Sequence, residues 1–498
     1  MTFVSNVLEL FSYLFIFIIG MGALWVVLLY IIDITQTKHA IRRNFPVVGR
    51  FRYMFEHLGE FFRQYFFALD REEMPFNRAE RSWCYRAAKG IDTTVAFGST
   101  RDLRRPGTVI FANTAYPTLE EDSQQPIDYT FGPYCETPYT TDRFFHVSGM
   151  SFGAISKPAV LALSRGAKAA GCWMNTGEGG LSSYHLEGGA DIVYQIGTAK
   201  YGVRNEQGGL DDDKLRKVAA YDQVKMFEIK LSQGAKPGKG GILPGVKVTK
   251  EIAKIRGIPV GHDSISPNRH PEIKDAASLL DMVNHVREVT GKPVGFKAVM
   301  GGFCWLRDLC EEINRRGLES APDFITVDSG DGGTGAAPQP LIDNVGLAIR
   351  ESLPKVVDEL VAAGLRDRIK LIASGKLINP EYGAAAFCYG ADFITSARGF
   401  MFALGCIQAL QCNKNTCPTG ITTHKRKLQR GLVPSDKAER VRKYQREMEE
   451  EISIIAHSCG ASRPRLMERR HCRIVQPNGL SIPMDELYPQ PESSQMSS

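Results

Sequence analysis

Apolar runs of strand length alternate with stretches of helix length from Phe144 to Arg398, and this alternation constrains the fold more than any other feature. Parallel strands need crossover connections, which are usually helices. The alternation therefore predicts an α/β fold, a (β/α)8 TIM barrel within residues 141–430. The predicted strands are FFHVSG, CWMNTG, VKMFEIKL, IPVGHD, PVGFKAV, FITVDSG, IKLIASG and DFITSARG.

The N-terminus carries a run of 23 residues, from Leu10 to Ile32, without a charged side chain. Such a run is long enough to cross the hydrocarbon core of a bilayer as a helix. A cleaved signal peptide is disfavoured by the length of the run and by the lack of a basic segment before it. We expect a transmembrane helix within residues 1–34. Basic residues follow the run, so the positive-inside rule predicts a single-pass protein of the inner (cytoplasmic) membrane with its barrel in the cytoplasm.

The regions around the barrel are less regular. We expect a juxtamembrane segment and an irregular N-terminal collar over residues 35–140, with the collar in the part from about residue 70, which is rich in Arg, Pro and Tyr. Within it, the aromatic stretch Phe55–Phe67 has two readings, a helix on a membrane surface or core packing. Residues 431–476 predict a charged helical extension against the barrel. Residues 477–498 are polar and rich in Pro and Ser, which predicts a disordered tail.

Composition excludes some classes of function. The net charge of +6 is weak for 498 residues, and the basic residues are scattered without an aromatic-basic motif, so no nucleic-acid partner is expected. The 43% apolar content supports a large buried core. Eleven cysteines at irregular spacing suit reduced thiols better than the disulfide framework of a secreted protein.

Glycine-rich loops with charged residues follow the predicted strands, at the barrel end where active sites lie. Glu178 stands inside NTGEGG after the second predicted strand, and Lys230 ends the third. Glu178 has an alternative role, in which its carboxylate organises the loop. A strand-end lysine such as Lys297 can likewise pair with a barrel carboxylate instead of serving the site. The other residues of these loops are Ser148, Gly149, Met150, Lys236, Asp331, Gly332, Gly333, Ser374, Gly375, Lys376, Ala397 and Arg398. The last two loops predict a phosphate-binding site.

Cys406, Cys412 and Cys417 lie at spacings of six and five residues in GCIQALQCNKNTCPTG. Thiolates on one short loop can converge on an iron–sulfur core. On spacing alone, three small buried hydrophobic residues explain the pattern equally well. The phosphate-type loops just upstream favour the cluster, because a flavin phosphate beside a metal cluster indicates electron transfer.

Taken together, SGMSFGAIS, NTGEGG, IKLSQGAKPGKGGILPG, DGGTGA and the three cysteines resemble the FMN-binding synthase domain of glutamate synthase, over residues 140–430. The resemblance implies FMN, and a 3Fe-4S cluster on the three cysteines. It also implies that 2-oxoglutarate and ammonia condense to 2-iminoglutarate, which reduced FMN converts to L-glutamate. By the same resemblance, Lys230 and the SGM, GDGGTG, SGK and SARG loops contact the flavin. Glu178, Lys236 and Arg256 match the oxo-acid site.

The chemistry of these residues suits those roles. A dicarboxylate needs cations at both ends, and Lys236 supplies a point charge while Arg256 can clamp a carboxylate bidentately. Lys230 is expected to stabilise the anionic reduced flavin. Glu178 is expected to position the imine or to relay a proton to it.

Two departures from the family leave the substrate open. GKGGILPG puts Ile242 where the family usually has Gln in GEGGQLPG, and SPNRHPEI, from Ser266 to Ile273, replaces another family loop. Losing a hydrogen-bonding group can change specificity strongly. The first cysteine is Cys84, so no N-terminal glutaminase cysteine is expected, and no dinucleotide fingerprint follows a strand. Ammonia or an amine is therefore expected from solution or a partner, and electrons from an unidentified donor.

Two classes of function remain at this stage. The first is a membrane-anchored oxidoreductase acting on CH-NH2 donors, which makes glutamate, an N-substituted relative or a different amino acid. The second is a membrane-bound electron-transfer subunit that keeps the barrel without the oxo-acid chemistry. Glu178, Lys236 and Arg256 favour the first, and Ile242 keeps the second open.

Overall fold

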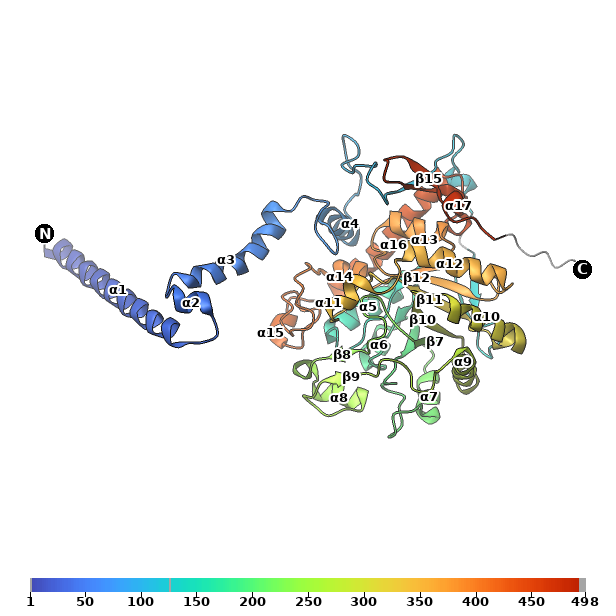
Figure 1. The fold of residues 1–498 in the computed structure, drawn as a ribbon, viewed down its shortest axis with the longest axis horizontal. Coiled ribbons are helices and arrows are strands. Elements are labelled where there is room, and N and C mark those ends of the chain that lie inside the picture. The colour runs from blue at the N-terminus through green and yellow to red at the C-terminus, as the bar shows by residue number, and fades with distance from the viewer. Residues whose placement is uncertain (1, 125–126, 492–498) are drawn as a thin grey trace, which may run out of the picture. The chain divides into compact units, whose positions relative to one another are not determined.

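The computed structural model describes residues 2–124 and 127–491 (Figure 1). The chain divides into two compact units within helix α4 (Arg78–Lys89), between Ala79 and Glu80. The boundary falls within the region predicted to hold the juxtamembrane segment and the collar, residues 35–140. Residues 35–79 group with the N-terminal helix, whereas residues from Glu80 onward group with the barrel.

The first unit is helical: α1 (Thr2–Thr35), α2 (Ala40–Asn44), α3 (Gly49–Phe62) and a π-helical turn (Arg63–Phe67). Among the described residues, α1 is the one helix long and apolar enough to cross a membrane, a test that a signal sequence also passes. Its end is tied to the start of α3 by a bidentate ion pair. Arg50 Nη2 and Nε lie 2.7 and 2.8 Å from the carboxylate oxygens of Asp33.

The aromatic stretch predicted between Phe55 and Phe67 is not packed into a core of this first unit. The side chains of Phe55, Phe61, Phe62, Phe66 and Phe67 are all exposed. They contact one another instead, for example Phe61 with Tyr65 at 4.7 Å between ring centroids. Within the first unit, the stretch Phe55–Phe67 therefore does not form a packed core, which was one of its two interpretations.

The second unit is a closed barrel of eight parallel strands, which confirms the predicted TIM-barrel fold. Each strand pairs with the next along the chain, and the last pairs with the first through Ser396 and Val147. The barrel strands are β4 (Phe145–Val147), β5 (Met174–Asn175), β6 (Ile192–Ile196), β7 (Val224–Lys230), β10 (Val294–Val299), β11 (Phe324–Asp328), β12 (Lys370–Ser374) and β13 (Phe393–Ser396).

Seven of the eight predicted strands are present, and one was wrong. IPVGHD, residues 258–263, forms a turn after Gly257, which ends helix α8 (Lys250–Arg256) with a left-handed φ of 67°. Its two apolar residues flank a proline and offer no continuous run. The missing strand is β6, whose five residues are all buried between glycines at 189 and 197. Lys230 therefore ends the fourth barrel strand, not the third.

Helices cover the outside of the barrel (Figure 1). The longer connection between β7 and β10 carries a small hairpin, β8 (Ile242–Leu243) and β9 (Ser264–Ile265), with α8 between its strands. The remaining helices of the barrel are α5 (Lys157–Ala170), α6 (Ser183–Gly188), α7 (Asp212–Ala219), α9 (Ala276–Thr290), α10 (Cys304–Arg316), α11 (Gln339–Asn344), α12 (Ile349–Ala362), α13 (Pro380–Cys388), α14 (Arg398–Leu404) and α15 (Arg426–Gln429).

A hairpin of β2 (Tyr129–Phe131) and β3 (Tyr139–Thr141) closes the amino-terminal end of the barrel. Phe131 is fully buried, and its ring lies 4.8 Å from that of Phe393 and 5.7 Å from that of Phe324, at the starts of two barrel strands. Burying such an aromatic side chain contributes about 2–3 kcal/mol. With this end filled by side chains, the open end is the carboxyl-terminal one.

Helix α16 (Pro434–Ser458) packs against the barrel through one face that includes Val441, Tyr444 and Met448. The charged extension predicted over residues 431–476 is thus a helix, but an integral part of the barrel wall. The disordered tail predicted from residue 477 is wrong for its described part. Strands β1 (Val109–Phe111), β14 (Cys472–Val475) and β15 (Ser481–Pro483) form one sheet, followed by α17 (Met484–Leu487). Residues 492–498 lie outside the described part.

Candidate active site

A two-lobed pocket opens at the carboxyl ends of the barrel strands. The first lobe is lined by Glu178, Lys230, Lys236 and Arg256, together with apolar side chains such as Ile242. The second lobe is lined by the loops after β4, β7, β11, β12 and β13, and by Lys297 of β10. Gly149, Gln195, Lys230, Gln233, Gly333, Ala397 and Arg398 line both lobes, so they form one continuous site.

Glu178 is the carboxylate at the centre of the first lobe. Its Oε2 lies 3.0 Å from Lys230 Nζ, and both side chains are largely buried. Burial favours the neutral form of Glu178, but the neighbouring cations, chiefly Lys230 and Lys236, outweigh it and lower the pKa of the carboxyl. Glu178 is therefore an anion at neutral pH that can accept hydrogen bonds but holds no proton to donate.

Close packing of glycines fixes this carboxylate. A Cβ atom at Gly241 would lie 2.1 Å from Glu178 Oε1, and one at Gly197 would lie 2.6 Å from Glu178 Cβ. Real Cβ atoms do not approach other atoms so closely, so both positions require glycine. Within the described residues, the polar partner of the Glu178 carboxylate is the Lys230 side chain and not the backbone of its own loop, so these contacts do not support a loop-organising role.

Lys236 and Arg256 complete the charge of the first lobe. Burial is the main cause that lowers the pKa of Lys236 to about 8, and the charge of Lys230 adds to it. Arg256 donates through Nη1 to Ser264 Oγ at 3.2 Å and through Nη2 to Phe152 O at 3.2 Å. Its buried Nε has no hydrogen-bond partner in the described part of the chain, and so is available to an acceptor.

The second lobe gathers hydroxyl groups and cations. Ser148 Oγ and Ser374 Oγ lie 3.5 Å apart, and Gly375, with a φ of 103°, passes so close to Ser329 that a Cβ there would lie 2.5 Å from Ser329 Cβ. Lys376 and Arg398 also line this lobe. Hydroxyl groups, backbone at a glycine and two cations match the needs of a bound phosphate.

Lys297 lines the second lobe and makes the pairing that sequence reasoning left open. Its Nζ lies 3.2 Å from Asp328 Oδ2, and the strand register places it directly beside Lys230. Burial opposes the charged form of Lys297, but Asp328 and then Glu228 outweigh it, so the pKa of Lys297 is raised. It is a fixed cation at the floor of the pocket.

Two of the predicted cofactor residues do not line either lobe. Asp331 forms an ion pair with Lys376, 3.0 Å between Oδ2 and Nζ, and accepts a hydrogen bond from Ser329. Gly332 packs behind it, where a Cβ would lie 2.9 Å from Ser329 O. They support the loop of Gly333, which does reach the pocket. Met150 and Ala397 line the pocket as predicted.

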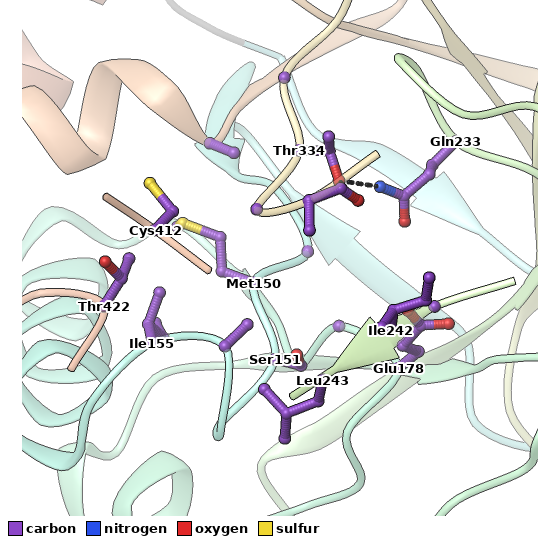
Figure 2. Close-up of a pocket in the computed structure, with 18 of the residues that line it drawn as sticks. Met150, Ser151, Ile155, Glu178, Gln233, Ile242, Leu243, Thr334, Cys412 and Thr422 are labelled. Atoms are coloured by element: carbon purple, nitrogen blue, oxygen red, sulfur yellow. Dashed lines mark hydrogen bonds between the residues drawn. The ribbon is translucent and has the colours of Figure 1, made fainter. Parts of the chain in front are cut away.

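The three cysteines predicted as cluster ligands lie on one loop after α14. Cys412 lines the first lobe, on the side of Met150 and away from Glu178 and Ile242 (Figure 2). Burial raises the pKa of the Cys406 thiol, with a smaller contribution from the other two thiols. Among residues 2–124 and 127–491, no three His, Cys, Asp or Glu side chains converge to hold a single metal ion. The three cysteines lie on the same loop, but their thiols do not converge on a position where one metal ion could bind all three.

Sequence reasoning missed several residues of the site. Gln233 accepts a hydrogen bond from Lys230 and donates through Nε2 to Thr334 Oγ1 at 3.1 Å (Figure 2). Lys247, on the β8–β9 insertion, also lines the first lobe. Both Gln233 and Lys247 lie in the stretch IKLSQGAKPGKGGILPGVK. The polar residues among glycines after a strand in this stretch are a pattern that could have indicated them as site residues.

A buried carboxylate beneath the pocket was also missed. Glu228 accepts hydrogen bonds from Asn175 Nδ2 at 2.8 Å, from Gln195 Nε2 at 2.6 Å and from Thr326 Oγ1 at 2.6 Å. It therefore joins four barrel strands in the barrel interior and fixes Gln195, which lines both lobes. Its place inside the run VKMFEIK masked it among apolar residues.

A parallel barrel with one carboxylate among cations at its carboxyl end belongs to the class of TIM-barrel enzymes. The family described as the conserved region in glutamate synthase matches residues 103–462. The chain belongs to the glutamate synthase family, whose members are oxidoreductases.

Two relatives illustrate the match. The glutamate synthase large subunit-like protein YerD of Bacillus subtilis is 40% identical over 516 residues, covering 95% of this chain and 98% of YerD. The archaeal-type glutamate synthase (NADPH) of Dehalococcoides mccartyi is 33% identical, over 59% of this chain and 55% of the relative. The chain thus spans nearly all of YerD but about half the length of the archaeal-type relatives.

Solved structures with similar folds are more distant in sequence. A mandelate oxidase with (S)-4-hydroxymandelic acid aligns with a TM-score of 0.47 at 14% identity, over 79% of this chain and 98% of the oxidase. A flavocytochrome b2 variant with benzoylformate aligns with a TM-score of 0.46 at 13% identity, over 82% of each chain.

Proposed function

We propose that this chain is an FMN-dependent oxidoreductase that reduces the imine formed from 2-oxoglutarate and ammonia to L-glutamate. The observation that carries the proposal is the first lobe, where one ionised carboxylate, Glu178, faces the cations Lys230, Lys236 and Arg256. A surplus of buried positive charge beside a single anion suits a substrate with two carboxylates. Membership of the glutamate synthase family supports the same substrate.

The second lobe supports FMN as the cofactor. The hydroxyl groups of Ser148 and Ser374, the backbone at Gly375 and the cations Lys376 and Arg398 would hold its phosphate. Lys230 lines both lobes and Lys297 lines the second, and both would face the flavin ring. When bound, FMN supplies the electron pair that reduces the imine. A fixed cation beside the ring would stabilise its anionic reduced form.

The residues of the chain hold and orient the substrate. Lys236 and the free Nε of Arg256 would each bind one carboxylate, which fixes the oxo carbon between them. Glu178 is ionised, so it would accept hydrogen bonds from the nitrogen of the ammonium or the iminium group and hold it in place. Ile242 and Leu243 cover the site and keep water away from the imine.

The proposal includes a 3Fe-4S cluster on Cys406, Cys412 and Cys417. Soft thiolate donors on one loop are the chemistry that such a cluster requires, and a cluster separates its ligands more widely than a single ion does. Arg398 Nη1 lies 3.8 Å from Cys412 Sγ, and both residues line the first lobe. Electrons from a donor protein would reach the flavin by this side of the pocket.

The test uses anaerobic full-length protein whose flavin has been photoreduced. Addition of 2-oxoglutarate with ammonia should reoxidise the flavin and yield one glutamate per flavin, whereas either substrate alone should not. The absorbance of oxidised flavin and the amino-acid product are the two readouts. Reduced flavin that persists with both substrates present contradicts the proposal.

A second reading of the substrate is kept because Ile242 lines the pocket on the side of Glu178 (Figure 2). An apolar side chain there suits a substituted amine or another oxo acid as the substrate. The product of the enzyme would then be an N-substituted or a different amino acid. Ile242→Gln tests this directly. If the wild type leaves 2-oxoglutarate and ammonia unused while Ile242→Gln consumes them, the chain acts on another substrate. If neither does, with reducible flavin and cluster, the electron-transfer role is favoured.

We also propose that α1 anchors the chain in the inner membrane with the barrel in the cytoplasm. The uncharged run from Leu10 to Ile32 within α1, and the basic residues after the helix, Lys38, Arg42 and Arg43, support this orientation. Protease added to intact spheroplasts should leave the barrel uncut, and lysed spheroplasts serve as the control. Cleavage of the barrel in intact spheroplasts would contradict the proposed orientation. Release of the chain by alkaline carbonate would contradict the proposed membrane anchor.

A further inference from the structure

Lys247 is a fully buried lysine whose position the proposed reaction does not explain. It ends the short turn Gly245–Lys247 of the β8–β9 insertion, and its side chain is 2% exposed. Its Nζ donates to Ala154 O at 2.6 Å and to Cys412 O at 3.2 Å. The amine therefore joins three segments of chain: its own insertion, the loop after β4 and the cysteine loop.

Lys247 differs from three of the other buried lysines, which pair with carboxylates; Lys236, in the same lobe, resembles Lys247 in having no carboxylate partner among the described residues. Lys200 pairs with Glu272 at 2.9 Å, Lys230 with Glu178 and Lys297 with Asp328. In the part of the chain that the structure describes, no carboxylate pairs with Lys247. A buried ammonium without a counter-charge is costly, so it needs a source of negative charge nearby.

The cysteine loop would be that source once its thiols bind the proposed cluster. The Lys247 amine donates to the backbone carbonyl of Cys412 itself, at 3.2 Å. A second tie holds the two segments in place, because Asn415 Nδ2, on the cysteine loop, donates to Val246 O at 3.0 Å. The amine is thus fixed beside the proposed cluster ligands and beside the pocket, which Lys247 and Cys412 both line.

We propose that Lys247 is a positioning residue that holds the cysteine loop against the pocket and, through its positive charge, raises the reduction potential of the iron–sulfur cluster. The inference rests on the cluster of the proposed function. Gaining an electron makes the cluster more negative, and a fixed cation in a low-dielectric interior stabilises that state. Hydrogen bonds to two backbone carbonyls keep the amine from moving away when the cluster charge changes.

The experiment compares full-length Lys247→Gln, Lys247→Met and Lys247→Arg proteins, purified without oxygen. Iron and flavin per chain are measured first, and the midpoint potential of the cluster is then titrated by EPR. Gln keeps a hydrogen-bond donor without the charge, and Met removes both. We expect both to lower the midpoint potential, and Arg to keep it near the wild-type value. Lys200→Met, which removes a buried lysine away from the cysteines, should leave the potential unchanged.

Each outcome decides a different point. A Lys247→Gln protein that retains iron at the wild-type potential overturns the role of the charge. Loss of iron in Lys247→Met but not in Lys247→Gln supports the hold on the cysteine loop, and full iron in Lys247→Met with unchanged EPR line shape contradicts it. Wild-type protein that is folded but holds no iron overturns the cluster itself, and with it this inference. A wild-type cluster with an unshifted Gln variant overturns the inference alone.

Discussion

Replacing Glu178 by Gln tests whether the pocket charges are arranged for a substrate with two negative charges. Glu178 Oε2 lies 3.0 Å from Lys230 Nζ, and their side chains are 16% and 9% exposed. Removing one partner of a buried ion pair costs about 3–5 kcal/mol, because the other charge stays buried and unpaired. Gln keeps an acceptor oxygen in the same place. We therefore expect a loss near the lower limit, about 3 kcal/mol in the free energy of unfolding.

The same variant should respond more strongly to substrate. Without the Glu178 charge, Lys230, Lys236 and Arg256 lose the anion that they share, and the two carboxylates of 2-oxoglutarate can replace it. A ligand at a hundred times its Kd stabilises a protein by about 2.7 kcal/mol, and tighter binding adds to this. Urea unfolding at pH 7, followed by tryptophan fluorescence with and without 2-oxoglutarate, measures both effects. The ligand-induced gain should be larger in Glu178→Gln than in the wild type.

Glu272→Gln is the matched control. It removes the carboxylate partner of another buried lysine, Lys200, whose Nζ lies 2.9 Å from Glu272 Oε1. Because Glu272 is 47% exposed, water compensates part of the loss, so the destabilisation should be smaller. The gain from 2-oxoglutarate should equal that of the wild type. The reasoning is refuted if Glu178→Gln unfolds at the wild-type urea concentration, or if its gain from 2-oxoglutarate does not exceed that of Glu272→Gln.

Three further predictions concern the same pocket. Because the pKa of Lys236 is about 8 and the protonated form binds the anion, kcat/KM for the oxo acid should fall as pH rises through 8. Lys236→Arg should lack this fall in the pH profile. Arg256→Ala should lower kcat/KM roughly 30-fold, from about 2 kcal/mol of lost charged hydrogen bonding, with unchanged flavin content. Cys412→Ser should lose iron but keep FMN, and equal loss of both in metal and flavin assays contradicts separate sites.

The barrel could be predicted because its strands are short apolar runs whose polar residues gather at one end. The strand Ile192–Ile196 was missed although it is fully buried. It is followed by a single glycine, Gly197, with no charged residue or turn motif directly after the strand. Residues 258–263 were wrongly predicted to be a strand, because two apolar residues on either side of a proline resemble a short strand in the sequence. Only the φ of 67° at Gly257 shows that the chain turns there.

The site could be predicted in composition but not in its pairings. Glu178, Lys236 and Arg256 line one lobe, the first two on loops after barrel strands and Arg256 at the end of helix α8. Lys376 lines the second lobe, and it also pairs with Asp331 across two loops, a pairing that the sequence did not predict. Such pairings depend on the distance between loops that are neighbours in the barrel but far apart in the chain. Glu228 and Lys247 were missed because their partners come from several distant segments.

The sheet that joins β1 to β14 and β15 sets the order in which the chain can be completed. Val109 pairs with Ile474, and Arg473 pairs with Pro483, so β1 cannot pair until residues 472–483 have been synthesised. Contacts of such long sequence separation form late and slowly. If α1 is already inserted in a membrane by then, the barrel must close while tethered. A truncation before Cys472 would leave β1 without a partner, an open edge on every newly made molecule.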